Sequence, residues 1–425
     1  MDAVAGRAGV VSADAPADTP VELVLDGFAH GGAAVGRLPD GRACFVDYGI
    51  PGERVTVRLT QERRRWARAT VVDVLDPSPD RVTPPCPLFG PGRCGGCSTQ
   101  HIAVPHQAEL LGAVIAEQLR RIGGLEPPGG HVEVITPHGP DGLGYRNRAR
   151  FAVTDDGRLA FRRARSHETI AVDDCPLLTP AARSALHEIA QGWDRVSEVR
   201  LQAGTDGRAA LAATTTGRDA RVPSTLPVTL RRRGTRTRPS DRSRVHHEVA
   251  GHTFVASATS FFQASTAAAE VLVGLVRAWT PVAAGDHVVD CYAGVGLFSV
   301  ALAADGVRVT AIESAADACA DARVNAAGLP IEVRRVDLTA PPAIDTPVDA
   351  VVLDPPRTGV GASVTAWIGG LSPRLVTYVS CDPATFARDA RLLADHGLVL
   401  ERLVGVDQFT HSGLVELVGS FRRVP

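Results

Sequence analysis

The sequence has no lysine, no long uncharged apolar run and no large excess of either charge. All 45 basic residues are arginine and 47 residues are acidic, so the formal net charge is −2. This balance does not indicate a nucleic-acid partner, although arginine carries a planar donor fork suited to phosphates and bases. The apolar runs are too short to cross a bilayer, and the first 20 residues lack a basic-then-apolar secretion signal. We therefore expect a cytoplasmic protein with no membrane attachment.

Length and composition predict a multidomain chain. At about 150 residues per domain, 425 residues are enough for two or three domains. Residues 1–19, rich in Ala, Asp and Pro, predict a disordered tail, and a cluster of prolines after Asp76 marks the end of a first domain at 20–78. A central domain at 79–250 and a C-terminal domain at 251–425 complete the expected division.

The first domain alternates β-rich segments with glycine turns. The expected strands are Val21–Leu25, Ala43–Val46, Arg54–Leu59 and Ala67–Val74. Several short strands with turn signals predict a small barrel, and barrels of the OB type commonly bind oligonucleotides. The spacing alone is equally compatible with a generic small β domain.

The central region contains an expected amphipathic helix at Val104–Ile122 and an arginine-rich stretch at Thr229–Arg244. That stretch holds seven arginines and one acidic residue, Asp241. We expect it to form an exposed loop or hairpin. A run of like charges is usually a solvated face, and contact with phosphates is the less common interpretation.

The C-terminal region alternates strands and helices. Its expected strands are His287–Cys291, Val307–Ile312, Ile331–Val336, Ala350–Leu353, Leu375–Ser380, Leu398–Val406 and Leu414–Phe421. Helical segments separate the first five. This alternation predicts a doubly wound α/β sheet of the Rossmann type.

A glycine turn follows the first of these strands. Gly294 and Gly296 lie between that strand and the next helix, where glycines allow a ligand to approach the backbone. Glu313 ends the following strand about 20 residues on, where a carboxylate can accept hydrogen bonds from a ribose. Asp354 and Arg357 follow the fourth strand, at the sheet edge where ligands bind. The glycine turn alone fits many nucleotide binders, or a Rossmann-like turn without a ligand.

Cys381 ends the fifth strand, directly before an expected helix. Asp382 is a good N-cap residue, and Pro383 is well suited to the first helical position. The thiol is therefore expected at a helix N-terminus, where the helix dipole favours the thiolate. A cysteine at a strand end is more often a small buried hydrophobic residue, but its place beside a cofactor pocket favours catalysis.

Five motifs in this order resemble the RNA uracil-5 methyltransferase family, and the resemblance covers nearly the whole chain. The motifs are Ser260-Phe261-Phe262-Gln263, Asp290–Gly296, Asp354–Gly359, Ser380–Thr385 and Asp407–Glu416. The first domain resembles the TRAM domain of the same family through Phe45-Val46 and Pro51–Val55. The resemblance implies a class I, Rossmann-like methyltransferase domain at the C-terminus, preceded by a small OB-like TRAM barrel and a central α+β iron–sulfur domain.

The resemblance also implies roles for single residues. Cys381 would add to carbon 6 of a uracil in RNA, which activates carbon 5 toward the methyl group of S-adenosylmethionine. Glu416 would then remove the carbon 5 proton so that the thiol can leave. The target base must leave its stack to enter such a pocket. The positions expected to bind S-adenosylmethionine are Gln263, Tyr292, Gly294, Gly296, Glu313 and Asp354.

Four positions depart from the family pattern. Ser265 stands where an Asn usually follows the Phe-Phe-Gln motif, and Leu297 stands where some members have a cofactor-contacting Asn. Thr410 and Leu414 replace a usual Pro and His near the expected base. These changes bear on cofactor contact and substrate choice rather than on the reaction. We expect the neighbouring His411 to be a core or loop histidine.

Four cysteines form a further pattern. Cys86, Cys94 and Cys97 are spaced C-x7-C-x2-C, and Cys175 follows in an Asp-Cys-Pro sequence. In a chain without a secretion signal, four thiolates indicate zinc or an iron–sulfur cluster rather than disulfides. The resemblance implies a [4Fe-4S] cluster, although the first gap is two residues longer than the family's C-x5-C-x2-C. We expect a structural cluster that orders the central domain against RNA.

Several alternatives remain open at this point. A cytosine-5 RNA methyltransferase also uses a cysteine nucleophile, but usually in a different motif. A non-catalytic RNA-binding protein of similar architecture would not need both Cys381 and Glu416. Among RNA targets, a TRAM-like domain with a cluster favours 23S ribosomal RNA over transfer RNA. We expect a monomer.

Overall fold

The computed structural model describes residues 20–217, 219–232 and 243–424. The expected tail at 1–19 and most of the arginine-rich stretch therefore lie outside the described residues. The chain divides into two compact units, one of Met1–Ala29 with Ala33–Arg81 and one of His30–Gly32 with Val82–Pro425. None of the helices in the described ranges combines the length and apolar character needed to span a bilayer.

The first unit contains a closed five-stranded barrel with the strand order β1-β2-β3-β5-β4, which confirms the expected small barrel. Its strands are β1 (Val21–Ala29), β2 (Ala33–Arg37), β3 (Ala43–Asp47), β4 (Arg54–Glu62) and β5 (Trp66–Asp76). Along β4, Val55, Val57 and Leu59 are buried while the residues between them are not, the period-two pattern of a strand with one face in a core. Strand β2 was not predicted, because its Ala-Ala-Val-Gly-Arg sequence has only one β-branched residue and depends on pairing with β1 and β3.

A buried ion pair joins Arg81, the last residue of the barrel unit, to Glu53. The Glu53 side chain is fully buried, and its carboxylate accepts hydrogen bonds from Arg81 Nε and Nη2, both at 2.6 Å. The backbone N–H groups of Ile50 and Ser78 donate to the same carboxylate at 2.9 and 3.1 Å. Burial raises the pKa of Glu53, but these hydrogen bonds together outweigh it and the pKa is lowered.

The second unit begins with an irregular segment and the helix α1 (Val104–Gln118), followed by a single π-helical turn, η1 (Leu119–Gly123). The predicted helix to Ile122 is therefore correct in place but changes its hydrogen-bonding pattern in the last turn. Gly124, at φ 65°, ends it in the left-handed conformation that glycine adopts easily.

A six-stranded sheet with the order β12-β11-β10-β7-β8-β9 forms the middle of the second unit. Helix α2 (Pro180–Ile189) packs on this sheet, and their apolar side chains share one core. A separate hairpin follows the sheet. The strands of the sheet are β7 (Arg148–Val153), β8 (Leu159–Arg162), β9 (Thr169–Ala171), β10 (Val196–Ala203), β11 (Ala209–Thr215) and β12 (Val228–Arg232). The strands of the hairpin are β13 (Arg244–Val249) and β14 (His252–Ser257).

The largest sheet has eight strands in the order β17-β16-β15-β18-β19-β21-β20-β6. The strands are β6 (Val134–Ile135), β15 (His287–Cys291), β16 (Arg308–Glu313), β17 (Ile331–Arg335), β18 (Ala350–Leu353), β19 (Leu375–Ser380), β20 (Leu398–Phe409) and β21 (Leu414–Arg423). Strands β15 to β19 are parallel to one another, β21 runs antiparallel to β19, and β20 forms an antiparallel hairpin with β21. The predicted doubly wound sheet is confirmed.

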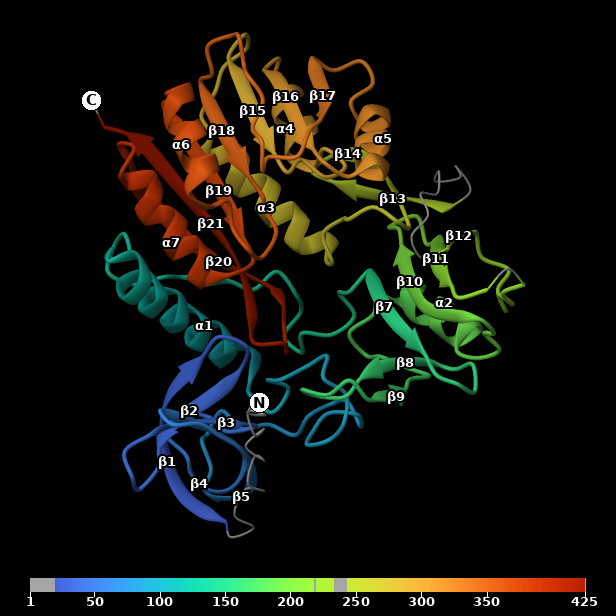
Figure 1. The fold of residues 1–425 in the computed structure, drawn as a ribbon, viewed down its shortest axis with the longest axis vertical. Coiled ribbons are helices and arrows are strands. Elements are labelled where there is room, and N and C mark those ends of the chain that lie inside the picture. Colours follow the sequence, from blue (N-terminus) through green and yellow to red (C-terminus); the bar gives the residue numbers. More distant parts are fainter. Residues whose placement is uncertain (1–19, 218, 233–242, 425) are drawn as a thin grey trace, which may run out of the picture. The chain divides into compact units, whose positions relative to one another are not determined.

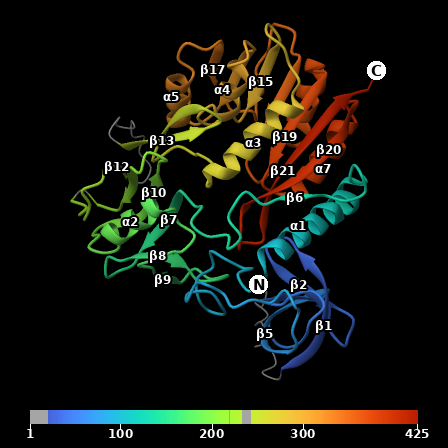
Figure 2. The same ribbon diagram turned by 180° about the vertical axis from the view of Figure 1, so that it is seen from behind.

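Helices cover both faces of this sheet (Figures 1 and 2). Along β18, Ala350 and Val352 pack into one core and Val351 and Leu353 into the other, because successive side chains of a strand point to opposite faces. The first core is shared with α3 (Thr266–Trp279) and α4 (Leu297–Ala303), and the second with α1, α6 (Gly361–Leu371) and α7 (Pro383–Ala394). Helix α5 (Ala316–Asn325) lies against β14, β16 and β17.

The strand order places a ligand-binding crevice between β15 and β18. From β15 the chain moves outward to β16 and β17, and it then returns to β18 on the other side of β15. In open α/β sheets, ligands bind outside the carboxyl ends of the strands at such a reversal. The residues that follow Cys291, Leu353 and Ser380 emerge at this edge.

We predict that Arg81→Ala destabilises the barrel by about 3 kcal/mol, because the fully buried Glu53 loses its partner. The stabilisation by the Glu53–Arg81 ion pair is fully present above the ordinary pKa of glutamate. It is lost as the pH falls through the lowered pKa of Glu53 in the folded protein. Hydrogen exchange of barrel peptides in the intact chain, followed by mass spectrometry, measures this change. Arg54→Ala is the control, since its ion pairs with Glu22 and Asp76 are exposed and contribute little to stability. If both variants showed equal protection of the barrel from hydrogen exchange, the buried Glu53–Arg81 pair would not be a major source of barrel stability.

Candidate functional site

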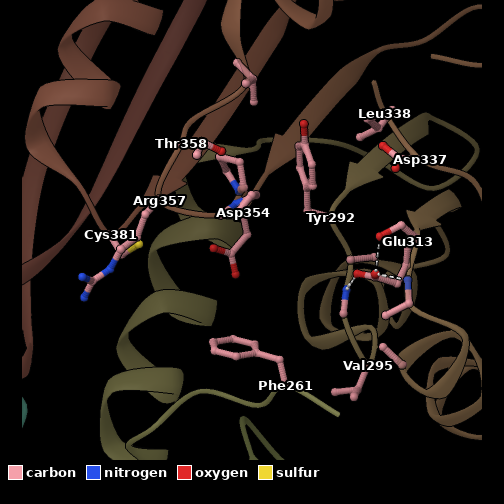
Figure 3. A pocket seen from close by; sticks show the side chains of 18 of the residues that line it. Phe261, Tyr292, Val295, Glu313, Asp337, Leu338, Asp354, Arg357, Thr358 and Cys381 are labelled. Carbon is pink, nitrogen blue, oxygen red and sulfur yellow. Dashed lines mark hydrogen bonds between the residues drawn. The ribbon is translucent and has the colours of Figure 1, made fainter. Parts of the chain in front are cut away.

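A pocket of about 1380 Å³ opens at the carboxyl edge of the large sheet. It brings together seven of the eight residues that the sequence indicated for cofactor binding and catalysis. These are Gln263, Tyr292, Gly294, Glu313, Asp354, Cys381 and Glu416. The eighth, Gly296, does not line the pocket and is instead the N-cap residue of α4. Figure 3 shows Cys381 and Arg357 together, Asp354 and Tyr292 facing the open space, and Phe261 opposite Asp354.

The glycine turn after β15 has the backbone that its sequence predicts. Gly294 and Gly296 have φ values of 56° and 89°, in the left-handed region that favours glycine. Tyr292 also has a positive φ, 62°, which is a strained conformation for an aromatic residue. Glu313 accepts hydrogen bonds from the N–H groups of Gly294 at 3.0 Å and Ala315 at 2.6 Å. The carboxylate therefore fixes the turn while it lines the pocket.

Asp354 lies at the end of β18, where Gln263 donates a hydrogen bond from Nε2 to Oδ2 at 3.2 Å. This bond joins the Phe-Phe-Gln loop to the Asp-Pro-Pro-Arg segment. Burial raises the pKa of Asp354, and the nearby carboxyl of Asp290 raises it further. Burial likewise raises the pKa of Asp290 to about 7, although Ser299 donates a hydrogen bond to it.

The cysteine after β19 has the expected local geometry but the opposite pKa shift. Asp382 accepts a hydrogen bond from Thr385 N at 2.9 Å, and Pro383 begins α7, as predicted. The pKa of Cys381 is raised to about 11, because burial of the thiol and the nearby Glu416 together outweigh a decrease from Arg357. Cys381 therefore lies at a helix N-terminus as predicted, and burial nevertheless raises the pKa of its thiol.

Glu416, on β21, is almost fully buried at the same pocket. Burial raises its pKa well above the usual range, and Asp354 raises it further. Gln408, on the neighbouring strand β20, donates a hydrogen bond from Nε2 to Glu416 Oε2 at 3.1 Å and favours the carboxylate. The thiol of Cys381 and the carboxyl groups of Asp354 and Glu416 thus share one largely buried site. Arg357 is the nearby cation.

Two groups that support this pocket were not predicted from the sequence. Asp321 on α5 is fully buried and accepts hydrogen bonds from Ser257 N and Oγ, Ser260 Oγ and Arg244 Nε at 2.6 to 3.1 Å. It anchors the start of the Phe-Phe-Gln loop. No sequence signal identified Asp321, because it is one of several polar residues in an alanine-rich helix.

Asn147, directly before β7, and Arg148, the first residue of β7, hold the other end of the same loop. Asn147 Nδ2 donates to Gln263 O at 3.0 Å, and Asn147 N donates to Ala264 O at 2.9 Å. Arg148 Nη1 donates to Phe262 O at 2.8 Å, and its guanidinium lies 4.9 Å from the centre of the Phe261 ring. These contacts join residues more than 100 positions apart, so local patterns do not indicate them.

The departures from the family pattern have identifiable surroundings. Ser265 is the N-cap residue of α3 and accepts a hydrogen bond from Ala268 N at 3.1 Å. Leu297 lines the pocket with an apolar side chain. His411 is buried, and its Nε2 lies 2.8 Å from Asp141 O and its Nδ1 3.1 Å from Gln107 Nε2. The expectation of a structural histidine agrees with these contacts.

The four clustered cysteines line a second cavity, of about 170 Å³. None of the four forms a disulfide. In the described ranges, no three His, Cys, Asp or Glu side chains are grouped closely enough to bind a metal ion. Pro91 and Gly92, in the first gap, are exposed and lie in a turn. A Cβ atom on Gly95 would lie 2.9 Å from the Cα of Ala164, so this close approach requires glycine.

Comparison with known proteins shows the affiliation of the chain. Residues 21–72 match the TRAM domain family. An uncharacterized RNA methyltransferase of Streptomyces coelicolor is 36% identical over 95% of this chain and 94% of its own length. The 23S rRNA (uracil(1939)-C(5))-methyltransferase RlmD of Halomonas elongata is 33% identical over 93% of this chain and 88% of its own length.

A solved structure shares the fold. The tRNA (uracil-54, C5)-methyltransferase of Pyrococcus abyssi, in complex with S-adenosyl-L-homocysteine, superposes with a TM-score of 0.71 at 23% identity. The match covers 94% of this chain and all of the other chain. With the barrel, the sheet and the pocket described above, these similarities show that the chain belongs to the S-adenosylmethionine-dependent RNA uracil-C5 methyltransferase family.

Proposed function

We propose that this protein transfers a methyl group to carbon 5 of a uridine in RNA, with Cys381 as the nucleophile and Glu416 as the base. The observation that carries the proposal is the single pocket lined by both residues and by the cofactor-binding candidates. Every one of these residues belongs to one chain, so we also propose that a monomer is active.

The cofactor fits the part of the pocket next to β15 and β16. Gly294 leaves the backbone open, Tyr292 offers an aromatic surface, and Glu313 offers carboxylate oxygens to a ribose. S-adenosylmethionine, when bound there, supplies an electrophilic methyl group. The hydrogen bond between Gln263 and Asp354 lies between this region and Cys381, so these two residues are suited to orient the uracil as well.

The residues near Cys381 account for the remaining steps. The thiolate adds to carbon 6 of the uracil and forms a carbon–sulfur bond, which makes carbon 5 nucleophilic. After methylation, the Glu416 carboxylate removes the proton from carbon 5, and the carbon–sulfur bond breaks to release the thiolate. Gln408 keeps Glu416 oriented and favours its charged form. Arg357 lowers the pKa of Cys381 and so favours the thiolate.

We further propose 23S ribosomal RNA as the substrate. The relatives that support it are the RlmD proteins, whose similarity extends over more than 90% of this chain, whereas the tRNA enzyme is similar in fold at 23% identity. Four arginines at the pocket, Arg231, Arg335, Arg357 and Arg388, offer contacts to phosphates. Methylation of 23S rRNA and tRNA transcripts, followed by nucleoside analysis and mapping of 5-methyluridine, tests the choice and distinguishes uracil from cytosine products.

The second cavity supports a [4Fe-4S] cluster as a structural cofactor. Cys86, Cys94, Cys97 and Cys175 line it together, and burial raises the pKa of Cys97 to about 12, with smaller contributions from the three other thiols. An electropositive cluster would remove this repulsion by taking all four as thiolates. Zinc also accepts four thiolates, so the choice of an iron–sulfur cluster rests on the family resemblance and on the metal analysis predicted below.

We predict that Cys381→Ala abolishes the covalent adduct with 5-fluorouridine RNA and lowers methylation by about 10⁴-fold or more. Glu416→Gln should instead form the methylated adduct with ordinary RNA and retain it, with turnover lower by about 10²- to 10⁴-fold. Denaturing electrophoresis and mass spectrometry detect the adduct. Cys44→Ala, in the barrel core, is the control. Unchanged activity of Cys381→Ala would exclude the mechanism.

We predict that alkylation of Cys381 in the ligand-free protein rises about tenfold per pH unit between pH 7 and about pH 10, because only the thiolate reacts and its pKa is about 11. Glu416→Gln removes a carboxylate that raises this pKa, so the reaction at a given pH should be faster. Arg357→Met should slow it. Peptide mass spectrometry gives the rates, and a plateau near neutral pH in the wild type would mean that the helix N-terminus outweighs burial.

We predict that protein isolated without oxygen contains about four iron atoms per chain and absorbs visible light as [4Fe-4S] proteins do. Cys97→Ala should lose the iron and bind RNA more weakly, while Cys44→Ala keeps both. One equivalent of zinc in place of iron would overturn the cluster proposal. Normal methylation by cluster-free protein would show that the cluster does not order the RNA-binding surface.

A further inference from the structure

We propose that His138 is a positioning residue that couples the Gln263 loop to the Glu416 hairpin through a directional chain of hydrogen bonds. The inference deepens the proposed function and rests on it. His138 precedes β7 in the middle of the second unit, far in sequence from both partners. Its Nδ1 lies 2.8 Å from Thr410 Oγ1 and its Nε2 lies 2.9 Å from Ser265 Oγ.

The directions of these hydrogen bonds follow from the groups at the two ends. Asp407 carries an acceptor oxygen 2.8 Å from Thr410 Oγ1, so the Thr410 hydroxyl donates to it. The Thr410 oxygen must then accept from His138, which places the ring proton on Nδ1. Nε2 is consequently the acceptor, and the Ser265 hydroxyl donates to it. Ser265 Oγ in turn accepts from Ala268 N.

One neutral tautomer of His138 therefore completes an uninterrupted chain. It runs from the first turn of α3 through Ser265, His138 and Thr410 to Asp407. Burial and, to a smaller extent, the nearby His411 lower the pKa of His138 to about 4, so the ring is neutral at physiological pH. A protonated ring would donate from both nitrogens and would break the bond from Ser265.

Tyr145 fixes the plane of the ring. The His138 and Tyr145 rings stack with centroids 3.9 Å apart and an interplanar angle of 15°. The Tyr145 hydroxyl also donates to Thr410 O at 3.0 Å. The same tyrosine thus holds the histidine and the backbone of its partner, which leaves the ring little freedom to lose either hydrogen bond.

Both ends of the chain connect directly to the pocket. Ser265 is two residues after Gln263, whose side chain bonds Asp354. Asp407 is adjacent to Gln408, whose side chain bonds Glu416. A displacement of Thr410 therefore shifts Gln408, which holds Glu416 in place. A displacement of Ser265 shifts Gln263, which bonds Asp354. His138 itself does not line the pocket, so it acts through these neighbours.

The chain also connects two of the departures from the family pattern. Ser265 and Thr410 supply the two hydroxyl groups that this histidine requires, in place of the usual Asn and Pro. A proline at position 410 has no side-chain hydroxyl to accept from Nδ1 or to donate to Asp407. The two substitutions are therefore partners through one ring and are expected to act as a unit.

The test uses the full-length protein, three single variants and the double variant that combines Thr410→Val with His138→Phe. Thr410→Val is nearly isosteric and removes the central hydroxyl. His138→Phe keeps the ring that stacks on Tyr145 but removes both hydrogen bonds, and His138→Gln keeps one donor and one acceptor. Steady-state kinetics, the fraction of enzyme in the covalent RNA adduct and the thermal midpoint are measured for each.

We expect Thr410→Val and His138→Phe each to lower kcat at least about tenfold and to raise the KM for S-adenosylmethionine, because small displacements in a pre-organised site are costly. The methylated adduct should accumulate on ordinary RNA, since proton removal slows. His138→Gln should recover part of the loss. The double variant should be no worse than His138→Phe alone, as expected for groups in one network.

Each outcome decides the proposal. Wild-type kcat, KM and adduct level in folded Thr410→Val and His138→Phe would overturn it, as would losses that multiply in the double variant. A lower thermal midpoint without a change in KM or adduct level would mean a purely structural role. If His138→Phe does not fold, Thr410→Val decides alone. Inactive wild-type protein on every RNA would instead contradict the proposed function, so the two failures are distinguishable.

Discussion

The register of the parallel strands β15, β18 and β19 is the constraint on which the rest of the site depends. Cys291 pairs with Leu353, and Leu353 pairs with Tyr378, so the three strands end nearly level. The Gly-x-Gly turn, the Asp-Pro-Pro-Arg segment and the nucleophile loop consequently emerge side by side. Because a slip of one residue would turn every side chain to the opposite face, the two apolar cores fix this register and thereby the pocket.

Burial is the second general influence, and it shifts the pKa of three acidic groups at the centre of the pocket in the same direction. It raises the pKa of Cys381, Asp354 and Glu416, because the charged form of each loses water. Arg357 and Gln408 oppose this shift for Glu416. Groups that interact in this way titrate together, so their protonation belongs to the assembled pocket rather than to any one residue. The same low polarity strengthens each hydrogen bond that orients them.

The loop that contributes Gln263 is held from outside the sheet. Its start bonds to Asp321 on α5, its backbone bonds to Asn147 and Arg148, and its end bonds to His138 through Ser265. These partners come from three different parts of the second unit. A loop fixed at several points loses little further entropy when a ligand binds, which is the physical basis of a pre-organised site. The middle of the chain therefore contributes to the geometry of the proposed methyl transfer without lining its pocket at His138 or Asn147.

The sequence by itself determined the bounds of β15, β18 and β19, the glycine turn and the cap at Asp382. These follow from local patterns, since strand periodicity, glycine turns and capping involve residues close together in the chain. Gln263, Tyr292 and Glu416 were indicated by the family resemblance instead, and the helix expected between β17 and β18 is replaced by a loop at 336–349. The tertiary structure alone decided the existence of β2, the extension of β20 to Phe409, the partners of Ser265 and Thr410, and the raised pKa of Cys381. Each of these depends on groups that only folding brings together: a strand forms where its neighbours offer hydrogen bonds, and a pKa shifts according to how much water and which charges surround the group. The thiol of Cys381 shows this difference most clearly. Four consecutive residues predict the helix N-terminus beside it, whereas the burial that raises its pKa depends on tertiary packing.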